Sequence, residues 1–150
     1  MTHTYYQNLY HLIWSTAERR PLLPPQSKHR IFEYLAGATK TAECLPVQIG
    51  GMSDHVHLLL AIPPKHAVSN IVRDIKICST KWIKGVLPDS QSFAWQEGFG
   101  SFSVSTSQKD VVMQYIMNQE EHHKTRTFQE EFVTFLKIHG VQYDEAFLWR

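Results

Sequence analysis

Apolar positions along the chain repeat with two periods, every second residue in some stretches and every third or fourth in others. Residues 5–16 are rich in aromatic and β-branched side chains and roughly alternate, which favours a β-strand. Residues 44–52 and 55–62 read as two further strands, with a tight turn near Ser53 and Asp54 between them. We therefore expect three strands here, the last two as antiparallel neighbours.

A fourth strand is expected where two apolar stretches stand close together. These are residues 91–96 and 102–106, with Gly98 and Gly100 between them. Glycine inside a strand pattern indicates a bulge or a turn. The strand should therefore be interrupted or turned at the glycines.

Helical spacing marks two segments between the strands. Residues 25–43 open on prolines, which suit a helix entrance, and carry apolar residues at helical intervals. A second helix should stop near Gly85 and Pro88. Its packed face is expected to comprise Val68, Ile71, Val72, Ile75, Cys78 and Trp82. The other side of this helix is basic.

Two more helices are expected at the C-terminal end. Ser107 followed by Asp110 has the spacing of a capping box and predicts the start of a third helix. Thr127 and Glu130 repeat that spacing for a fourth helix, which Gly140 would end.

The order of elements is strand, helix, strand, strand, helix, strand and two helices. This order predicts an α+β fold with a ferredoxin-like, four-stranded antiparallel sheet, helices on one face and additional C-terminal helices. The plan itself leaves the other sheet face open. With 150 residues and no evident linker or repeat, the chain is expected to form a single domain over residues 1–150.

The chain is nearly neutral, with 15 lysines and arginines against 14 aspartates and glutamates. Bulk charge therefore predicts neither a nucleic-acid partner nor a membrane surface, and any anion site must be local. Cys44 and Cys78 lie far apart in apolar-patterned segments, which favours free, buried thiols in a reducing cytoplasm. Residues 1–14 lack a signal-peptide pattern and no apolar run is long enough to span a membrane, so we expect a cytoplasmic protein.

Candidate chemistry begins with the stretch DHVHLLL at residues 54–60. On a strand, side chains two residues apart point to the same face, so His55 and His57 project together while Val56 and Leu58 point to the other face. Two neutral imidazoles in this arrangement can bind one divalent cation. Because His-x-His is a short motif, the site needs a third participant.

Tyr115 and Gln119 are the candidates for this third participant, because residues four apart on a helix share one face. Taken separately, the tyrosine suits an amphipathic core position and the glutamine a solvated one. Together with the histidine pair, a phenol and an amide on a later helix indicate a composite site.

Several ordered motifs at matching separations resemble the IS200/IS605-type transposases, single-tyrosine members of the HUH endonuclease superfamily. The stretch YHLIWSTAERRPLL is similar to that family's opening strand and loop, SDHVHLLLAIPP to its HUH strand, and VSNIVRDIKICSTKWIK to its second helix. The segment WQEGFGSFSVSTSQKDVVMQYIMNQEEHH is similar to the one that carries its nucleophile. The resemblance covers nearly the whole chain.

The resemblance implies that Tyr115 is the nucleophile and that His55, His57 and Gln119 bind the metal. The substrate would be single-stranded DNA, often with a hairpin near the cleavage site. The tyrosine would stay bound to the 5′ phosphate and leave a free 3′ hydroxyl, so no nucleotide cofactor is expected. Imidazole, amide and phosphate donors favour Mg²⁺ or Mn²⁺. The base that activates the tyrosine is not identified.

The family is typically dimeric, with the tyrosine helix of one subunit completing the histidine site of the other. We therefore expect a homodimer, and assembly of the site within one chain or between two stays open.

Local candidates for DNA contacts are few in this near-neutral chain. They are Arg19, Arg20, Arg73, Lys76, Lys84, Lys109 and Trp95. Trp82 falls on the apolar helix face and is interpreted as core, so Trp95 is the more open ring for base stacking. Glu120 and Glu121 are interpreted as solvated helix residues.

Three other functions compete with DNA cleavage and transposition. A histidine-triad nucleotide hydrolase is disfavoured because Leu59 stands where its third histidine would be. A non-catalytic module that binds single-stranded nucleic acid would not need Tyr115 or the histidine pair. A domesticated relative that processes hairpins for its host would keep the same chemistry.

Overall fold

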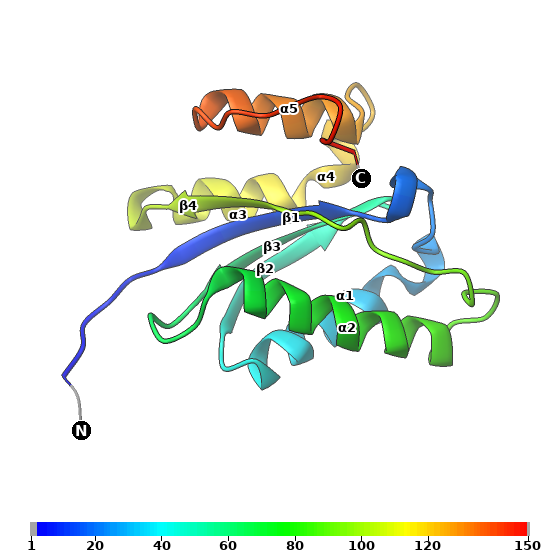
Figure 1. The fold of residues 1–150 in the computed structure, drawn as a ribbon, viewed down its shortest axis with the longest axis horizontal. Helices are drawn as coiled ribbons and strands as arrows, with labels where there is room; N and C mark the ends of the chain where they lie inside the picture. Colours follow the sequence, from blue (N-terminus) through cyan, green and yellow to red (C-terminus); the bar gives the residue numbers. More distant parts are fainter. Residues whose placement is uncertain (1–2, 150) are drawn as a thin grey trace.

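The computed structural model describes residues 3–149 and contains a four-stranded antiparallel sheet with helices on both faces (Figure 1). The elements in chain order are β1 (Leu9–Ser15), η1 (Ala17–Arg19), η2 (Pro25–Ser27), α1 (Lys28–Thr41), β2 (Leu45–Gly51), β3 (His55–Ala61), α2 (Val68–Val86), β4 (Gly100–Val104), η3 (Thr106–Gln108), α3 (Lys109–Met117), α4 (Gln119–His122) and α5 (Phe128–Ile138). The strand order is β2-β3-β1-β4, so the predicted ferredoxin-like α+β plan is confirmed.

Strand β1 occupies the middle of the sheet, between β3 and β4. Ile13 lies opposite His57 on one side and Gly100 on the other. The strand is shorter than the predicted residues 5–16, because it begins at Leu9. The predicted fourth strand is confirmed only for its second part, since residues 91–96 form no strand and contribute a single bridge, from Trp95 to Thr16 just after β1.

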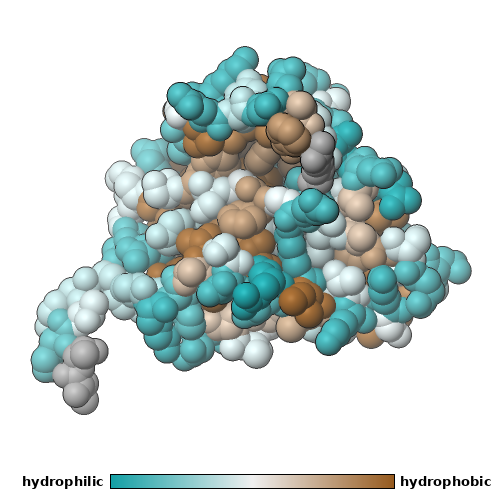
Figure 2. Space-filling view, in the orientation of Figure 1, coloured by the Kyte–Doolittle hydropathy of each residue, from teal (hydrophilic) through white to brown (hydrophobic). Residues whose placement is uncertain are grey.

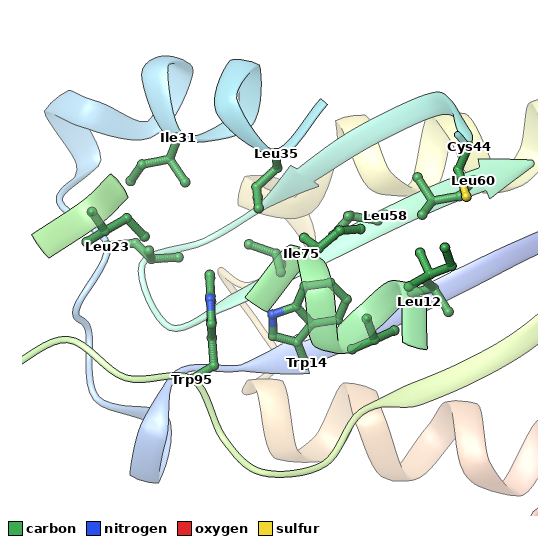
Figure 3. Packing of buried hydrophobic residues seen from close by; sticks show 14 of the residues in the cluster. Leu12, Trp14, Leu23, Ile31, Leu35, Cys44, Leu58, Leu60, Ile75 and Trp95 are labelled. Atoms are coloured by element: carbon green, nitrogen blue, oxygen red, sulfur yellow. The ribbon is translucent and has the colours of Figure 1, made fainter. Parts of the chain in front are cut away.

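The main core fills the space between the sheet and the helices α1 and α2 (Figure 3). Val56, Leu58 and Leu60 point into it from β3, as the alternation of the sequence predicts. Trp14 from β1 meets Trp95 edge-on, with ring centroids 6.0 Å apart. This side of the sheet is therefore a packed apolar scaffold.

The buried face of helix α2 differs slightly from the predicted face. Its buried side chains are Ile71, Val72, Ile75, Ser79 and Ile83. Cys78 is exposed, so the prediction that it is buried is wrong. The buried stripe of α2 instead passes through Ser79, because it follows a four-residue spacing. Trp82 is half-buried and stacks on Tyr34 with centroids 4.8 Å apart.

The second face of the sheet is covered by α3, α4 and α5, so the expectation of an open face is wrong. Ile13 and Phe102 pack there against α5, and Leu9 and Leu59 pack against Ile116 of α3. Burial on both faces explains why β1 and β3 are almost continuously buried.

Helix α5 begins and ends as its sequence predicts. Thr127 and Glu130 form the capping box, and Gly140 has a left-handed φ of 66°. The amide of Val141 donates to the carbonyl of Leu136, and that of Gly140 donates to the carbonyl of Lys137, which is the Schellman pattern.

Helix α3 differs from its prediction at both ends. A 3₁₀ turn precedes it and its N-cap is Gln108, without a side-chain cap bond, so the predicted capping role of Ser107 is wrong. The helix ends at Met117, and Gln119 begins the short helix α4.

Within residues 3–149, no helix is long and apolar enough to cross a membrane.

Candidate active site

Two buried histidines from β3 form the floor of the site on the face that α3, α4 and α5 cover. The Nδ1 of His55 lies 2.7 Å from Oδ1 of Asp54, and its Nε2 lies 2.9 Å from Oε1 of Gln119. The Nδ1 of His57 lies 2.8 Å from Nε2 of His11 on β1. Each ring is thus held through its Nδ1, which leaves Nε2 directed into the site.

Glu131 of α5 brings a carboxylate to the same point. Its Oε1 lies 2.9 Å from Nε2 of His57 and 3.5 Å from Nε2 of His55. Ligand atoms of these three residues lie within 4.8 Å of one another. Together with the carbonyl oxygen of Gln119, the site offers two imidazole nitrogens and two oxygens, a set that fits a divalent cation such as Mg²⁺, Mn²⁺ or Zn²⁺.

The other carboxylate oxygen of Glu131 faces the helix that carries the tyrosine. Oε2 accepts a hydrogen bond from the phenol of Tyr115 and another, at 3.2 Å, from the amide nitrogen of Gln119. It also lies 3.3 Å from Nε2 of His123. One buried side chain therefore links the predicted metal ligands to the predicted nucleophile.

The charge of this buried carboxylate is balanced by histidine. Burial alone would raise the pKa of Glu131, but hydrogen bonds to His123 and His57 hold the pKa well below its usual range. Burial lowers the pKa of His57, so this ring is neutral and able to bind a metal. For His123 burial acts in the same direction, but the hydrogen bond and charge of Glu131 raise its pKa above the ordinary value. The charge partner of Glu131 is therefore His123.

Tyr115 is held firmly between rings. Its ring stacks on His122 with centroids 4.4 Å apart and meets Phe135 edge-on at 5.4 Å. Burial, followed by the negative charge of Glu131, raises the pKa of Tyr115 above its usual value. A raised pKa favours the protonated phenol, which donates its hydrogen bond to Glu131.

All four residues predicted for the centre meet in one chain, namely His55, His57, Tyr115 and Gln119. Sequence reasoning missed Glu131, which is the one buried carboxylate among residues 3–149. The sequence does contain a pattern that indicates this residue, since Glu131 lies within the apolar stripe of α5 between Phe128 and Phe135. A charged residue at a packed position of a helix needs a partner, and here that partner is the site.

The predicted DNA contacts are divided between two faces of the molecule. Helix α2 carries Arg73, Lys76 and Lys84 on the sheet face opposite the site (Figure 1). The ammonium group of Lys76 donates to the carbonyls of Gln96 and Gly98, and burial lowers its pKa to about 8. Lys76 therefore holds a loop of its own chain.

Trp95 is buried, with 8% of its surface exposed, and its indole nitrogen donates to Ser79. The expectation that it is the more open tryptophan is wrong, because its ring is part of the core. Lys109 is half-buried at the start of α3, and Arg20 is exposed after η1.

Arg19 lies closer to the site. It lines a groove of about 620 Å³ together with Asp54, His123, Lys124 and Arg126. Glu120 and Glu121 are exposed and pair with Lys28 and Lys124, so their interpretation as solvated residues is confirmed.

Comparisons with known proteins agree with this geometry. Residues 4–119 match the family model described as "Transposase IS200 like". The chain belongs to the IS200-like transposase family. It is 26% identical over 123 residues to the ISDra2 transposase TnpA of Deinococcus radiodurans, an alignment that covers 77% of this chain and 86% of that protein.

Two solved structures of transposases share the fold. A putative transposase from Deinococcus radiodurans R1 superposes with a TM-score of 0.64 and 26% identity, over 79% of this chain and 95% of that one. A REP-associated tyrosine transposase bound to a REP hairpin gives a TM-score of 0.60 at 16% identity, over 82% and 74% of the two chains.

The transposase match includes His55, His57, Tyr115 and Gln119 and ends at residue 119. Glu131 lies beyond that limit. The carboxylate of the site therefore comes from outside the segment that matches the family model.

Proposed function

We propose that this transposase cleaves and rejoins single-stranded DNA through a 5′-phosphotyrosine intermediate, with Tyr115 as the nucleophile, and so moves an insertion sequence. The contact between Tyr115 and Glu131, beside two histidines and an amide, is the observation that carries the proposal. Metal-assisted attack on a phosphodiester uses a nucleophile beside a bound cation, and Glu131 links Tyr115 to the cation-binding cluster here.

The metal would be bound by His55, His57, Gln119 and Oε1 of Glu131, and Mg²⁺ or Mn²⁺ suits their nitrogen and oxygen donors. When bound, the cation supplies positive charge to a non-bridging phosphate oxygen as negative charge develops in the transition state.

The chain's own residues account for the proton and the leaving group. The phenolic oxygen of Tyr115 attacks phosphorus, a bond to phosphorus forms, and the bond from phosphorus to the 3′ oxygen of the preceding nucleotide breaks. Oε2 of Glu131 already accepts the phenolic hydrogen bond, so it is placed to take the proton as the new bond forms. Because the pKa of Glu131 lies well below its usual range, the carboxyl does not keep that proton but passes it to the departing 3′ oxygen, which leaves as a hydroxyl. Attack by a free 3′ hydroxyl on the phosphotyrosine reverses these steps and rejoins DNA without ATP.

The groove that contains Arg19, Lys124 and Arg126 is the proposed approach for the DNA backbone. It reaches the site at His123 and Asp54, beside the histidine floor. Three cations along one groove suit a phosphate chain, whereas the basic side of α2 lies on the far face of the sheet.

The site is proposed to act in cis, since Tyr115 and Glu131 contact each other within one chain. A homodimer stays a prediction, and cleavage would not depend on helix exchange between its subunits.

The test is a covalent adduct. Labelled single-stranded DNA with a hairpin is incubated with the protein and Mn²⁺ and then run on a denaturing gel. We expect a metal-dependent shifted band that Tyr115→Phe abolishes while DNA binding is retained. Absence of the band with a range of sequences flanking the hairpin, or normal cleavage by His55→Ala, would contradict the proposal. A non-catalytic binding module would give binding without any adduct.

A further inference from the structure

A second cavity, of about 600 Å³, opens beside Tyr115 near the C-terminal end of α5. We name it the β4–α5 pocket. It lies between β4, α3 and α5, with His11 of β1 among its lining residues. Tyr115 forms part of its wall, so the pocket adjoins the proposed nucleophile.

Aromatic rings make one side of this pocket. The rings of Phe102 and His139 are 4.5 Å apart, and Phe135 lies 5.6 Å from Phe102 and 6.0 Å from His139. Phe135 also meets Tyr115 edge-on. Flat rings in this arrangement offer stacking surface and ring edges to another aromatic group.

Aliphatic and neutral polar side chains complete the lining. Val111 and Ile138 are 61% and 73% exposed at its border, although both are large and apolar. Ser103, Ser105 and Gln108 add hydroxyl and amide groups. None of the lining residues in the described chain is a lysine, arginine, aspartate or glutamate, so the pocket suits a flat, uncharged group with polar edges.

We propose that the β4–α5 pocket holds an unpaired nucleobase of the nucleotide next to the phosphate that Tyr115 attacks. This proposal rests on the proposed DNA cleavage and adds a base-binding site to it. A base can enter only when it is unpaired and unstacked, which is the state of single-stranded DNA. The cations of the Arg19 groove lie toward the other end of α5, so backbone and base contacts would flank the phosphate.

Photo-crosslinking tests the pocket independently of cleavage. Single-stranded oligonucleotides that carry one 5-iododeoxyuridine, moved position by position, are irradiated with the protein in the absence of metal, and crosslinked residues are mapped by mass spectrometry. We expect crosslinks to Phe102, Phe135 or His139 from a restricted set of positions.

Two tryptophan variants of α3 form a matched pair. Val111→Trp places an indole at the border of the pocket, whereas Gln114→Trp places one on an exposed position of the same helix outside the lining. The loss of one stacked base should reduce the crosslink yield about tenfold in Val111→Trp and leave Gln114→Trp at the yield of the unmodified chain. Ile138→Trp, on α5, should repeat the effect of Val111→Trp and guards against a local folding defect in α3.

Crosslinks confined to other surfaces, or equal yields from Val111→Trp and Gln114→Trp, would overturn the base-binding site. So would a change of oligomeric state in sedimentation that is specific to Val111→Trp, because the surface would then be a contact between subunits. The two proposals fail differently. A metal-dependent adduct without pocket crosslinks would contradict only the base-binding site. Pocket crosslinks without any adduct would contradict only the proposed cleavage chemistry.

Discussion

Replacing Glu131 by glutamine removes the buried negative charge and nearly preserves the shape of the side chain. Glu131 is 1% exposed and its carboxylate contacts His57, His123, Gln119 and Tyr115. Breaking a buried ion pair by removing one partner typically costs about 3–5 kcal/mol. His123 can limit that cost by losing its proton, so we expect Glu131→Gln to lower the free energy of unfolding by about 2 kcal/mol.

The loss should depend on pH in a defined direction. The raised pKa of His123 contributes stability that is fully present below its unfolded value of 6.5 and is lost as pH rises through the folded value. The lowered pKa of Glu131 contributes stability that is present above its unfolded value of 4.5 and is lost as pH falls toward the folded value. The difference between the unmodified chain and the variant should therefore be largest between about pH 4.5 and 6.5 and shrink at alkaline pH.

Scanning calorimetry in the presence of a chelator, at pH 6 and pH 9, measures the effect without metal. A loss of about 2 kcal/mol corresponds to a Tm lower by roughly 4–8 °C for a chain of this size. Glu130→Gln is the matched control, because Glu130 is exposed and a glutamine can also complete the capping box. An unchanged Tm in Glu131→Gln, or a loss that grows toward pH 9, would refute the assignment of His123 as the charge partner.

Three further predictions concern assembly and packing. Mixing inactive Tyr115→Phe with inactive His57→Ala should restore no adduct, because the site forms within one chain; restored cleavage would indicate exchange between subunits. Trp95→Phe should lower the free energy of unfolding by about 1 kcal/mol, because the hydrogen bond of the indole nitrogen is lost. Binding of single-stranded DNA in a filter assay should stay unchanged, and weaker binding would show that Trp95 contacts DNA. Gly50→Ala should reduce both thermal stability and adduct yield, because its Cβ would lie 2.6 Å from the carbonyl oxygen of Ile116 in the tyrosine helix; full activity would show that α3 can shift freely.

Local patterns predicted the fold well where one face of an element packs and the other does not. The two strands around Ser53 and Asp54, and the capping box and glycine stop of α5, follow from spacing and turn chemistry alone. The errors arose where tertiary packing decides. Residues 91–96 have strand composition, but only Trp95 forms a bridge, to Thr16 after β1, since its ring packs in the core.

The candidate site was predicted as far as the motifs extend. His55, His57 and Gln119 meet as expected, because strand alternation and helix periodicity set their directions. Glu131 was missed because its role depends on how α5 crosses the sheet, a long-range docking that no local pattern specifies. An ionisable residue within an apolar stripe is the sequence signal that could have directed attention to it.

The packing of the C-terminal segment has a practical consequence for the preparation of the protein. Trp149 lies under the guanidinium of Arg19, which donates a hydrogen bond to its carbonyl, and Arg19 lines the groove at the site. The N-terminal residues extend away from the sheet at the opposite end of the molecule (Figure 1), and Figure 2 shows apolar surface left visible below α5, beside the C-terminal segment. An affinity tag placed after Trp149 would crowd the DNA groove and that surface, so a purification tag or an immobilisation anchor belongs at the N-terminus.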